Sequence, residues 1–280
     1  MGSPPRESGH EEKESIYEVR FRHPFAMSAT EISVELFERF LRERDTSAEQ
    51  AAVNPVPRPN RLANPEVECP ILQARWTDAA DFCRWASAKL GLPISEDGFP
   101  KLNVGINGRI AVDKILYENA RSRQGLRPPM EEEWEYCARA GTETARSFGD
   151  DPALFARYAW FHGDSNSRSH PVGLLKPNEF GFHDMLGNAE EWCMDSSDYY
   201  PILRWKRGEL PTTRALLGWK ELPRTARGGY YDSRSDEIRS AYRAFLRPTT
   251  GILYFGFRVA RTLSNEEAAI VAQPAVRGHR

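Results

Sequence analysis

The segment from Gly181 to Trp192, GFHDMLGNAEEW, combines turn-forming residues, acids and backbone oxygens between two aromatic anchors. Two side chains and two backbone carbonyls in it could converge on one hard cation: Asp184, Gly187, Ala189 and Glu191. Calcium prefers such a set, with several oxygens, some of them charged, on a bent segment that wraps the ion. The same pattern also describes an ordinary tight turn with an Asx cap, so these residues alone leave both interpretations open.

Cysteine and histidine are a second possible source of metal or nucleophilic chemistry. The chain has four cysteines and six histidines, with no C-x-x-C pair and no spacing typical of a zinc site. Cys83 and Cys137 fall in expected helices among apolar neighbours, which favours buried free thiols. Three consecutive glutamates at 131–133 stand where a helix is expected to begin, and the helix dipole favours acids there. We therefore interpret them as helix-end residues and not as an acid/base constellation.

The composition argues against several classes of partner. The 280 residues are 40% hydrophobic and 11% aromatic, which is enough for a folded core. The net charge of −2, from 38 basic and 40 acidic residues, argues against non-specific nucleic-acid binding, which needs a basic face. No apolar run reaches the roughly 18 residues of a membrane span, and no signal-peptide core follows Met1. We expect a cytoplasmic protein that binds neither nucleic acid nor membrane.

The elements that must position these residues are clearest in the first half of the chain. Alternating apolar and charged residues predict a strand over Ile16–Arg22, and a short strand is expected within Phe25–Ile32. The segment Ile71–Trp76 is also strand-like. Capping residues and apolar spacing predict three helices: one capped by Ser33 and reaching Arg44, one capped by Thr77 over Asp78–Leu90, and one over Met130–Ala140.

From residue 141 onward, turns, aromatic residues and short apolar pieces alternate with no long helix. Helices followed by strand-poor, Trp-rich chain predict an α+β fold. We expect one domain over residues 1–262, with a surface insertion at 92–126 and a separate tail at 263–280. Many backbone groups in the second half must find partners outside strand ladders, in side chains, water or ions.

Several motifs occur in one order along almost the whole chain. They are MGSPPRESG at 1–9, PILQARWTDA at 70–79, RPPMEEEWEYCARAG at 127–141, PVG at 171–173, KPN at 176–178, the segment 181–192, RGG at 227–229, RSAYR at 239–243 and GFRVAR at 256–261. This ordered set resembles the formylglycine-generating enzyme (sulfatase-modifying factor) family. The resemblance implies a C-type-lectin-like fold with little regular secondary structure. It also implies structural calcium held at the positions of Asp184, Gly187, Ala189 and Glu191.

The chain departs from this family where the oxidases carry out their chemistry. Family oxidases bind copper(I) through two cysteines five residues apart, in the segment that follows Arg-Gly-Gly. Those positions hold Ser233 and Ile238 here, and neither a hydroxyl nor an alkyl group can hold this soft ion. We therefore expect neither copper nor thiol oxidation. Glu190 is a further departure, because the family has an aromatic residue beside the calcium motif.

Without the cysteines, the segments 230–234 and 245–255 still combine aromatic and polar residues in a mix that suits recognition of a protein or peptide ligand. The expected ligand contacts are Tyr230, Asp232, Ser233, Arg234 and Tyr254. Tyr231 is favoured as a core residue. Diversity-generating retroelement variable proteins, which share the fold, display ligand-binding residues on this part of the chain.

The predicted function is a non-oxidase binding or sensor domain, which could belong to a larger multidomain protein because such domains often follow kinase or ATPase modules. Three alternatives stay open. The chain could keep the oxidase role by an unrecognised route, display a variable ligand-binding surface, or serve as a structural accessory domain that binds only calcium.

Overall fold

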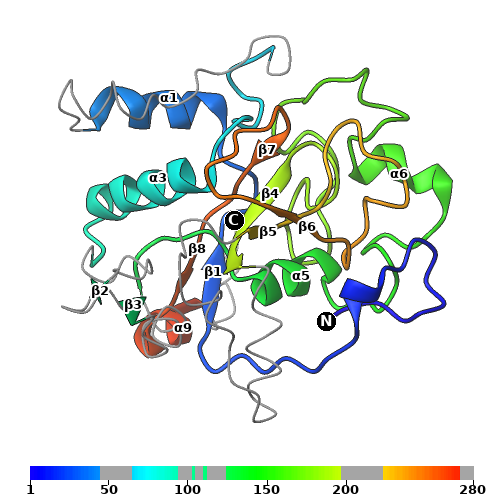
Figure 1. Ribbon diagram of the computed structural model, residues 1–280, viewed down its shortest axis with the longest axis horizontal. Helices are drawn as coiled ribbons and strands as arrows, with labels where there is room; N and C mark the ends of the chain where they lie inside the picture. Colours follow the sequence, from blue (N-terminus) through cyan, green and yellow to red (C-terminus); the bar gives the residue numbers. More distant parts are fainter. Residues whose placement is uncertain (45–64, 94–102, 105–109, 112–123, 197–222, 272–280) are drawn as a thin grey trace, which may run out of the picture.

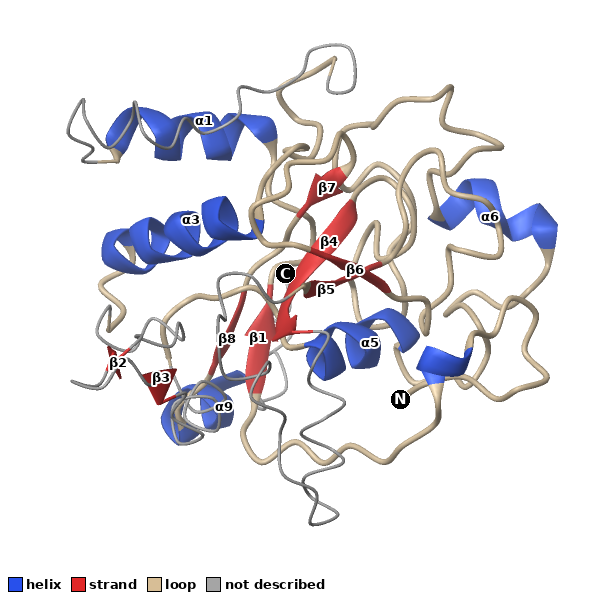
Figure 2. Cartoon of the chain, viewed as in Figure 1, coloured by secondary structure: helices blue, strands red, loops and turns tan. Residues whose placement is uncertain are grey.

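The computed structural model describes residues 1–44, 65–93, 103–104, 110–111, 124–196 and 223–271 (Figure 1). Its elements in chain order are η1 (Glu12–Glu14), β1 (Phe25–Met27), α1 (Val34–Glu43), α3 (Trp76–Lys89), β2 (Asn103–Val104), β3 (Ile110–Ala111), α5 (Glu131–Arg139), α6 (Pro152–Tyr158), β4 (Glu190–Ser196), β5 (Arg224–Arg227), β6 (Ala244–Leu246), β7 (Phe255–Gly256), β8 (Ala260–Thr262) and α9 (Asn265–Val271). Irregular chain joins most of them (Figure 2). The predicted α+β class is confirmed.

A four-stranded sheet in the order β6-β5-β4-β7 forms the centre of the fold. Strand β4 runs antiparallel to β5, with Glu191 opposite Arg227, and parallel to β7, with Glu190 opposite Phe255. Because side chains alternate across a strand, Glu190 and Glu191 point to opposite faces of the sheet. A separate two-stranded sheet pairs β1 with β8.

The core has one cluster on each face of β4. Trp192 and Phe255, with ring centroids 4.6 Å apart, join the cluster of α1 and α3. The aromatic rings that those helices add include Phe37, Phe40 and Phe82. The other face packs against α5, where Trp134 of the helix and Cys193 of β4 share the second cluster. Strand β4 is therefore buried on both faces, and its acids Glu190, Glu191 and Asp195 are buried with it.

Helix α5 begins against the end of β4. The backbone N–H of Glu131 donates to Asp195 Oδ2 at 2.6 Å, and the Met130 N–H donates to Glu133 Oε2 at 2.8 Å. Arg127 pairs with the same Glu133 carboxylate at 2.6 and 2.7 Å. Two acids thus satisfy the first N–H groups of the helix although its N-cap residue, Met130, has no capping side chain. The three glutamates occupy the first turn of α5, as predicted.

The segment between β5 and β6 is held by two buried arginines. Arg227 donates to the carbonyls of Ser240, Ala241 and Tyr242 at 2.7–2.8 Å and pairs with Glu135 of α5. Arg243 pairs with Glu131 at 2.5 Å. These contacts place residues 228–243, which contain most of the predicted ligand surface, against the sheet and α5.

Some predicted elements are wrong. Ile16–Arg22 does not form a strand; the Ile16 side chain is 63% exposed, and the chain before it is held by hydrogen bonds such as that from Arg243 to the Lys13 carbonyl at 2.6 Å. Ile71 is buried, but the segment before α3 is irregular.

Helix α3 begins two residues earlier than a Thr77 cap predicts. Asp78 accepts from the Arg75 N–H at 2.9 Å and pairs with its guanidinium, so Arg75 is the N-cap residue. Most of the expected insertion at 92–126 and the end of the tail lie outside the described residues. In the described part of the chain, no helix has the length and apolarity required to cross a membrane.

Replacing Ser33 tests the predicted cap of α1. Its side chain accepts from the Leu36 N–H at 3.3 Å. We expect Ser33→Ala to lower the free energy of unfolding by about 1 kcal/mol, because the helix loses an N-cap acceptor. Urea unfolding followed by circular dichroism measures this change, and Ser33→Asp should retain most of the stability. Equal losses in both variants would contradict the capping role.

Candidate functional site

The turn from Asp184 to Glu191 has the backbone that a tight cation loop or turn requires. Asp184, Gly187 and Asn188 all have positive φ angles, of 53°, 78° and 58°. A Cβ at Gly187 would lie 2.0 Å from the Trp160 carbonyl oxygen, so only glycine fits there. The same carbonyl accepts from the Asn188 N–H at 2.8 Å. The predicted tight turn is therefore fixed by close backbone contact with the segment around Trp160.

Glu191 is fully buried and both of its carboxylate oxygens have partners. Arg258 donates to them at 2.6 and 2.7 Å, and the Trp134 indole N–H donates at 2.8 Å. Since a guanidinium already neutralises this carboxylate, Glu191 has little left to offer a second cation. Glu191, one acid of the predicted calcium set, is therefore already paired with Arg258.

Glu31 is a third buried acid at this turn, and sequence reasoning missed it. Its Oε1 accepts from the Asn188 side-chain amide at 3.3 Å, and its Oε2 is buried with no partner among the described residues. Asp184 accepts from the Gly173 N–H at 2.7 Å through Oδ2, while its Oδ1 is likewise buried without a described partner. Burial raises the pKa of both carboxyls, and that of Glu31 is raised further by the charge of Asp184.

The positive charge of Arg258 acts on all three acids, Glu31, Asp184 and Glu191. Unpartnered buried carboxylate oxygens are the feature that a bound cation would satisfy. In the described ranges, no group of three or more His, Cys, Asp or Glu side chains is arranged around one metal position. A calcium ion here would rely on two carboxylates and on backbone carbonyls. Asp184 and Glu31 each have one buried carboxylate oxygen, among the described residues, that could serve a cation.

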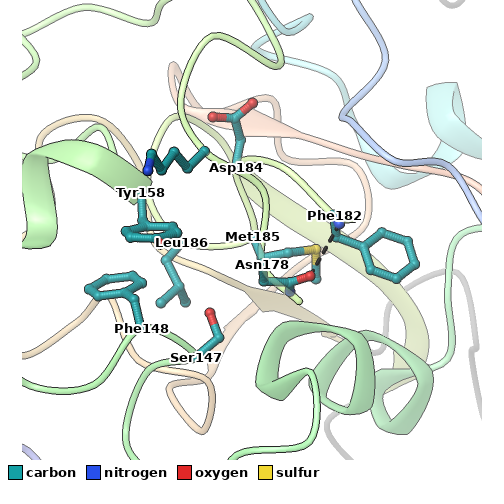
Figure 3. Close-up of a pocket in the computed structure, with 9 residues that line it drawn as sticks. Ser147, Phe148, Tyr158, Asn178, Phe182, Asp184, Met185 and Leu186 are labelled. Carbon is teal, nitrogen blue, oxygen red and sulfur yellow. Dashed lines mark hydrogen bonds between the residues drawn. The ribbon is translucent and has the colours of Figure 1, made fainter. Parts of the chain in front are cut away.

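A small hollow lies beside this turn. Figure 3 shows Phe148, Tyr158 and Leu186 in its lining, with the Asp184 carboxylate pointing away from the two rings. The rings of Phe148 and Tyr158 stack with centroids 4.9 Å apart. Asp184 also lines the hollow, which is formed mainly by packed side chains.

The predicted ligand surface is assembled in part. The rings of Tyr230 and Tyr254 stack at 3.8 Å with an interplanar angle of 12°, although 24 residues separate them in sequence. Asp232 Oδ1 lies 2.7 Å from His162 Nδ1, within hydrogen-bonding distance, and the side chains of Asp232 and His162 are 41% and 69% exposed. Arg234 is exposed and pairs with its neighbour Asp236. Four of the five predicted residues are at least partly accessible on this surface.

Ser233 and Tyr231 differ in role from the four accessible residues of this surface. Ser233 is buried, and its hydroxyl accepts from the Tyr230 N–H at 3.2 Å, so it stabilises the turn from the inside. Its predicted place among the exposed contacts is therefore corrected. Tyr231 packs against the buried Leu72 and Ala189, as its predicted core role requires.

Ser233 and Ile238 lie close together although five residues separate them. A Cβ at Gly229 would lie 3.1 Å from Ser233 Oγ and 3.2 Å from Ile238 Cγ2. The two positions that the family resemblance assigns to copper ligands thus converge on one glycine, with no thiol at either. The chain's four cysteines, Cys69, Cys83, Cys137 and Cys193, are all buried, and burial raises the pKa of each thiol.

Glu190 is buried beside the aromatic part of this surface. Its side chain is 4% exposed, and Oε1 has no partner among the described residues. Burial, with a contribution from the charge of Glu237, raises its pKa to about 8. The sequence marked this position only as a departure from the family pattern, because the distance from Glu190 to the tyrosines depends on strand pairing.

Comparison with known proteins settles the family. The model of the sulfatase-modifying factor enzyme 1-like domain matches residues 2–263. The chain belongs to this family. It is 28% identical over 217 residues to the formylglycine-generating enzyme of Thermomonospora curvata, covering 70% of this chain and 67% of that protein. The chain spans 22% and 52% of the length of the first two curated relatives it matches.

Two solved structures show the same fold. PvdO from Pseudomonas aeruginosa matches with a TM-score of 0.66 and 25% identity, covering 94% of this chain and 90% of that one. Treponema denticola variable protein 1 matches with a TM-score of 0.58 and 22% identity, covering 85% and 84%. The expected fold of the formylglycine-generating enzyme type, an α+β fold of C-type-lectin-like kind, is confirmed.

The pKa of Glu190 gives a prediction for stability. The unfolded chain ionises this carboxyl near its ordinary value of 4.5, whereas the folded chain keeps the proton until about pH 8. Raising the pH between these values therefore favours the unfolded state, by about 5 kcal/mol in total. We expect Glu190→Gln to lack this loss, so that its stability advantage over the native chain grows from pH 4 to pH 8 in urea unfolding.

Glu179→Gln provides the control, because Glu179 is exposed. A parallel pH dependence of stability in the native chain and Glu190→Gln would contradict the prediction.

Proposed function

We propose that this chain is a non-oxidase binding domain on the scaffold of the formylglycine-generating enzyme family, with a peptide or protein segment as its ligand. The observation that carries the proposal is the convergence of Ser233 and Ile238 on Gly229, with every cysteine of the chain buried elsewhere. Copper(I) requires soft ligands, and a hydroxyl and an alkyl group supply none. The scaffold is therefore retained without the groups for thiol oxidation.

The surface formed by residues 230–234 and Tyr254 has the chemistry of a binding site. The stacked rings of Tyr230 and Tyr254 offer rigid aromatic area, and Tyr side chains lose little conformational entropy on binding. Asp232 with His162, and Arg234, add hydrogen-bonding groups at its edge. This combination of aromatic area and adaptable polar groups supports a peptide or protein ligand, in a chain that we propose is cytoplasmic and forms part of a larger protein.

One alternative is favoured by a specific comparison. Treponema denticola variable protein 1 has the same fold, and its name describes a variable protein. A surface that differs among close relatives at positions 230–234 and 254 would support this second candidate. A surface that is constant among them would support a fixed partner.

Peptide display tests the binding function. We expect a random peptide library to yield sequences that bind the native chain and lose at least about tenfold in affinity for the Tyr230→Ala/Tyr254→Ala variant, because aromatic anchors dominate such interfaces. Tyr136→Ala is the matched control, since Tyr136 is an exposed tyrosine on α5. Equal binding to the native chain and the double variant would refute this surface as the binding site.

An oxidase assay tests the absence of thiol chemistry. The chain is supplied with copper(I), oxygen and a cysteine-containing peptide, and mass spectrometry detects any aldehyde. We expect no aldehyde and no retained copper from the native chain, whereas Ser233→Cys/Ile238→Cys should retain copper because the two positions converge. Aldehyde formation by the native chain would refute the non-oxidase function.

We also propose that calcium is a structural cofactor of the turn at 184–191. Asp184 Oδ1 and Glu31 Oε2 would hold the ion together with the carbonyls of Gly187 and Ala189, and the ion would satisfy two buried oxygens that lack described partners. We expect calcium to raise the melting temperature, chelation to lower it, and Asp184→Asn to abolish the difference. Asp164→Asn, at an exposed acid, should respond like the native chain. An unchanged melting temperature with and without calcium would exclude this site.

A further inference from the structure

The stacked rings of Tyr230 and Tyr254 form an aromatic platform that the core supports. The two centroids lie 3.8 Å apart at an interplanar angle of 12°, and both side chains are half-buried. Tyr231 stands at 87° to the Tyr230 ring, with centroids 5.4 Å apart, and packs against the buried Leu72 and Ala189. The platform is therefore fixed in place before a ligand binds, while part of each ring remains accessible.

The backbone of the platform is already engaged. The Tyr230 N–H donates to Ser233 Oγ at 3.2 Å, and the Tyr230 carbonyl accepts from the Ser233 N–H at 2.9 Å. The Tyr254 carbonyl accepts from the N–H of Glu190, the first residue of β4, at 3.0 Å. A peptide that binds as an added strand needs free N–H and carbonyl groups at a sheet edge. Because these three groups are occupied, the platform offers its side chains to a ligand and not a strand edge.

The two phenol groups are donors that the protein leaves unused. In the part of the chain that the structure describes, neither phenol oxygen has a hydrogen-bond partner, and neither is buried away from solvent. Burial of the side chains raises the pKa of Tyr230 to about 12 and also raises the pKa of Tyr254, so both phenols keep their protons at neutral pH. The platform therefore presents two aromatic rings and two accessible O–H donors.

A polyproline II helix complements this set of groups. Its carbonyls point into solvent as acceptors, and its proline residues carry no N–H that would need a partner. Such helices bind to surfaces lined by aromatic side chains, and the preformed helix loses little conformational entropy on binding. Leu253, next to Tyr254 in the chain, is 49% exposed and adds apolar area. The surface thus matches a ligand that brings rings and acceptors but no backbone donors.

We propose that the ligand of this surface is a proline-rich segment in the polyproline II conformation, whose pyrrolidine rings lie against Tyr230 and Tyr254 and whose carbonyls accept from their phenols. This inference rests on the proposed peptide-binding function and names the class of peptide that the surface takes. A segment without proline would lose more conformational entropy on binding and would bring N–H groups that need acceptors.

The test uses two capped hexapeptides, one of six L-prolines and one of six D-prolines. The two peptides have the same composition and apolar area, but the D-peptide forms the mirror-image helix. Backbone amide signals of residues 230, 231 and 254 are followed by NMR during titration with each peptide. We expect saturable shifts with the L-peptide and at least about tenfold weaker binding of the D-peptide.

Two double variants separate the rings from the donors. Tyr230→Phe/Tyr254→Phe keeps the stacked rings and removes both O–H groups, so we expect it to bind the L-peptide at least about fivefold more weakly than the native chain. Phenylalanine fills the same space, so this loss would not reflect unfolding. Tyr230→Ala/Tyr254→Ala removes the platform and should show no saturable shift. Tyr136→Phe, at an exposed tyrosine of α5, should bind like the native chain.

Equal binding of the L- and D-peptides, unchanged affinity in either double variant, or no saturable shift with the L-peptide would each overturn the proposal. Peptides from the display experiment distinguish this failure from failure of the proposed function. Selected peptides that depend on Tyr230 and Tyr254 but contain no proline would leave the binding domain standing and remove the polyproline helix as its ligand. A library that yields no peptide dependent on these tyrosines would instead remove the peptide-binding surface itself.

Discussion

The buried ion pair between Glu191 and Arg258 is the interaction on which the rest of this fold depends. Arg258 also donates to the carbonyls of Ser28, Ala29 and His183 at 3.0–3.3 Å. One guanidinium therefore joins the central strand β4, the segment after β1 and the turn at 181–191. A fully buried pair contributes to stability only when its remaining hydrogen bonds are made, and here the Trp134 indole and the three carbonyls make them.

The same device recurs across the strand-poor half of the chain. Arg227 holds three consecutive carbonyls of the 240–242 segment, and Arg239 pairs with Glu7 and Glu14 near the first residues. Regular ladders are short in this fold, so backbone carbonyls in irregular segments need other donors. Buried arginines supply them, because a guanidinium carries five N–H groups in a fixed plane. This explains how a surface made of turns can hold a defined shape.

Against this background of paired acids, the unpaired ones stand out. Among the described residues, Glu31, Asp184 and Glu190 each have one buried carboxylate oxygen without a hydrogen-bond partner. Each such oxygen costs stability, because burial removes it from water without supplying a hydrogen-bond donor.

The sequence by itself determined the helices α1 and α5, the α+β class, the family and the two segments that carry the sites, because capping residues, periodicity and ordered motifs are local in the chain. It did not determine that Ser233 would be buried as a turn-stabilising hydroxyl, that Ile16–Arg22 would remain irregular, or that Glu31 would lie beside Asp184. Nor did it show Glu190 next to the tyrosines. These facts depend on contacts between residues far apart in sequence, such as the β4–β7 pairing and the Asn188–Glu31 hydrogen bond. Only the tertiary structure decides them, since side-chain environment is set by which distant segments the core brings together.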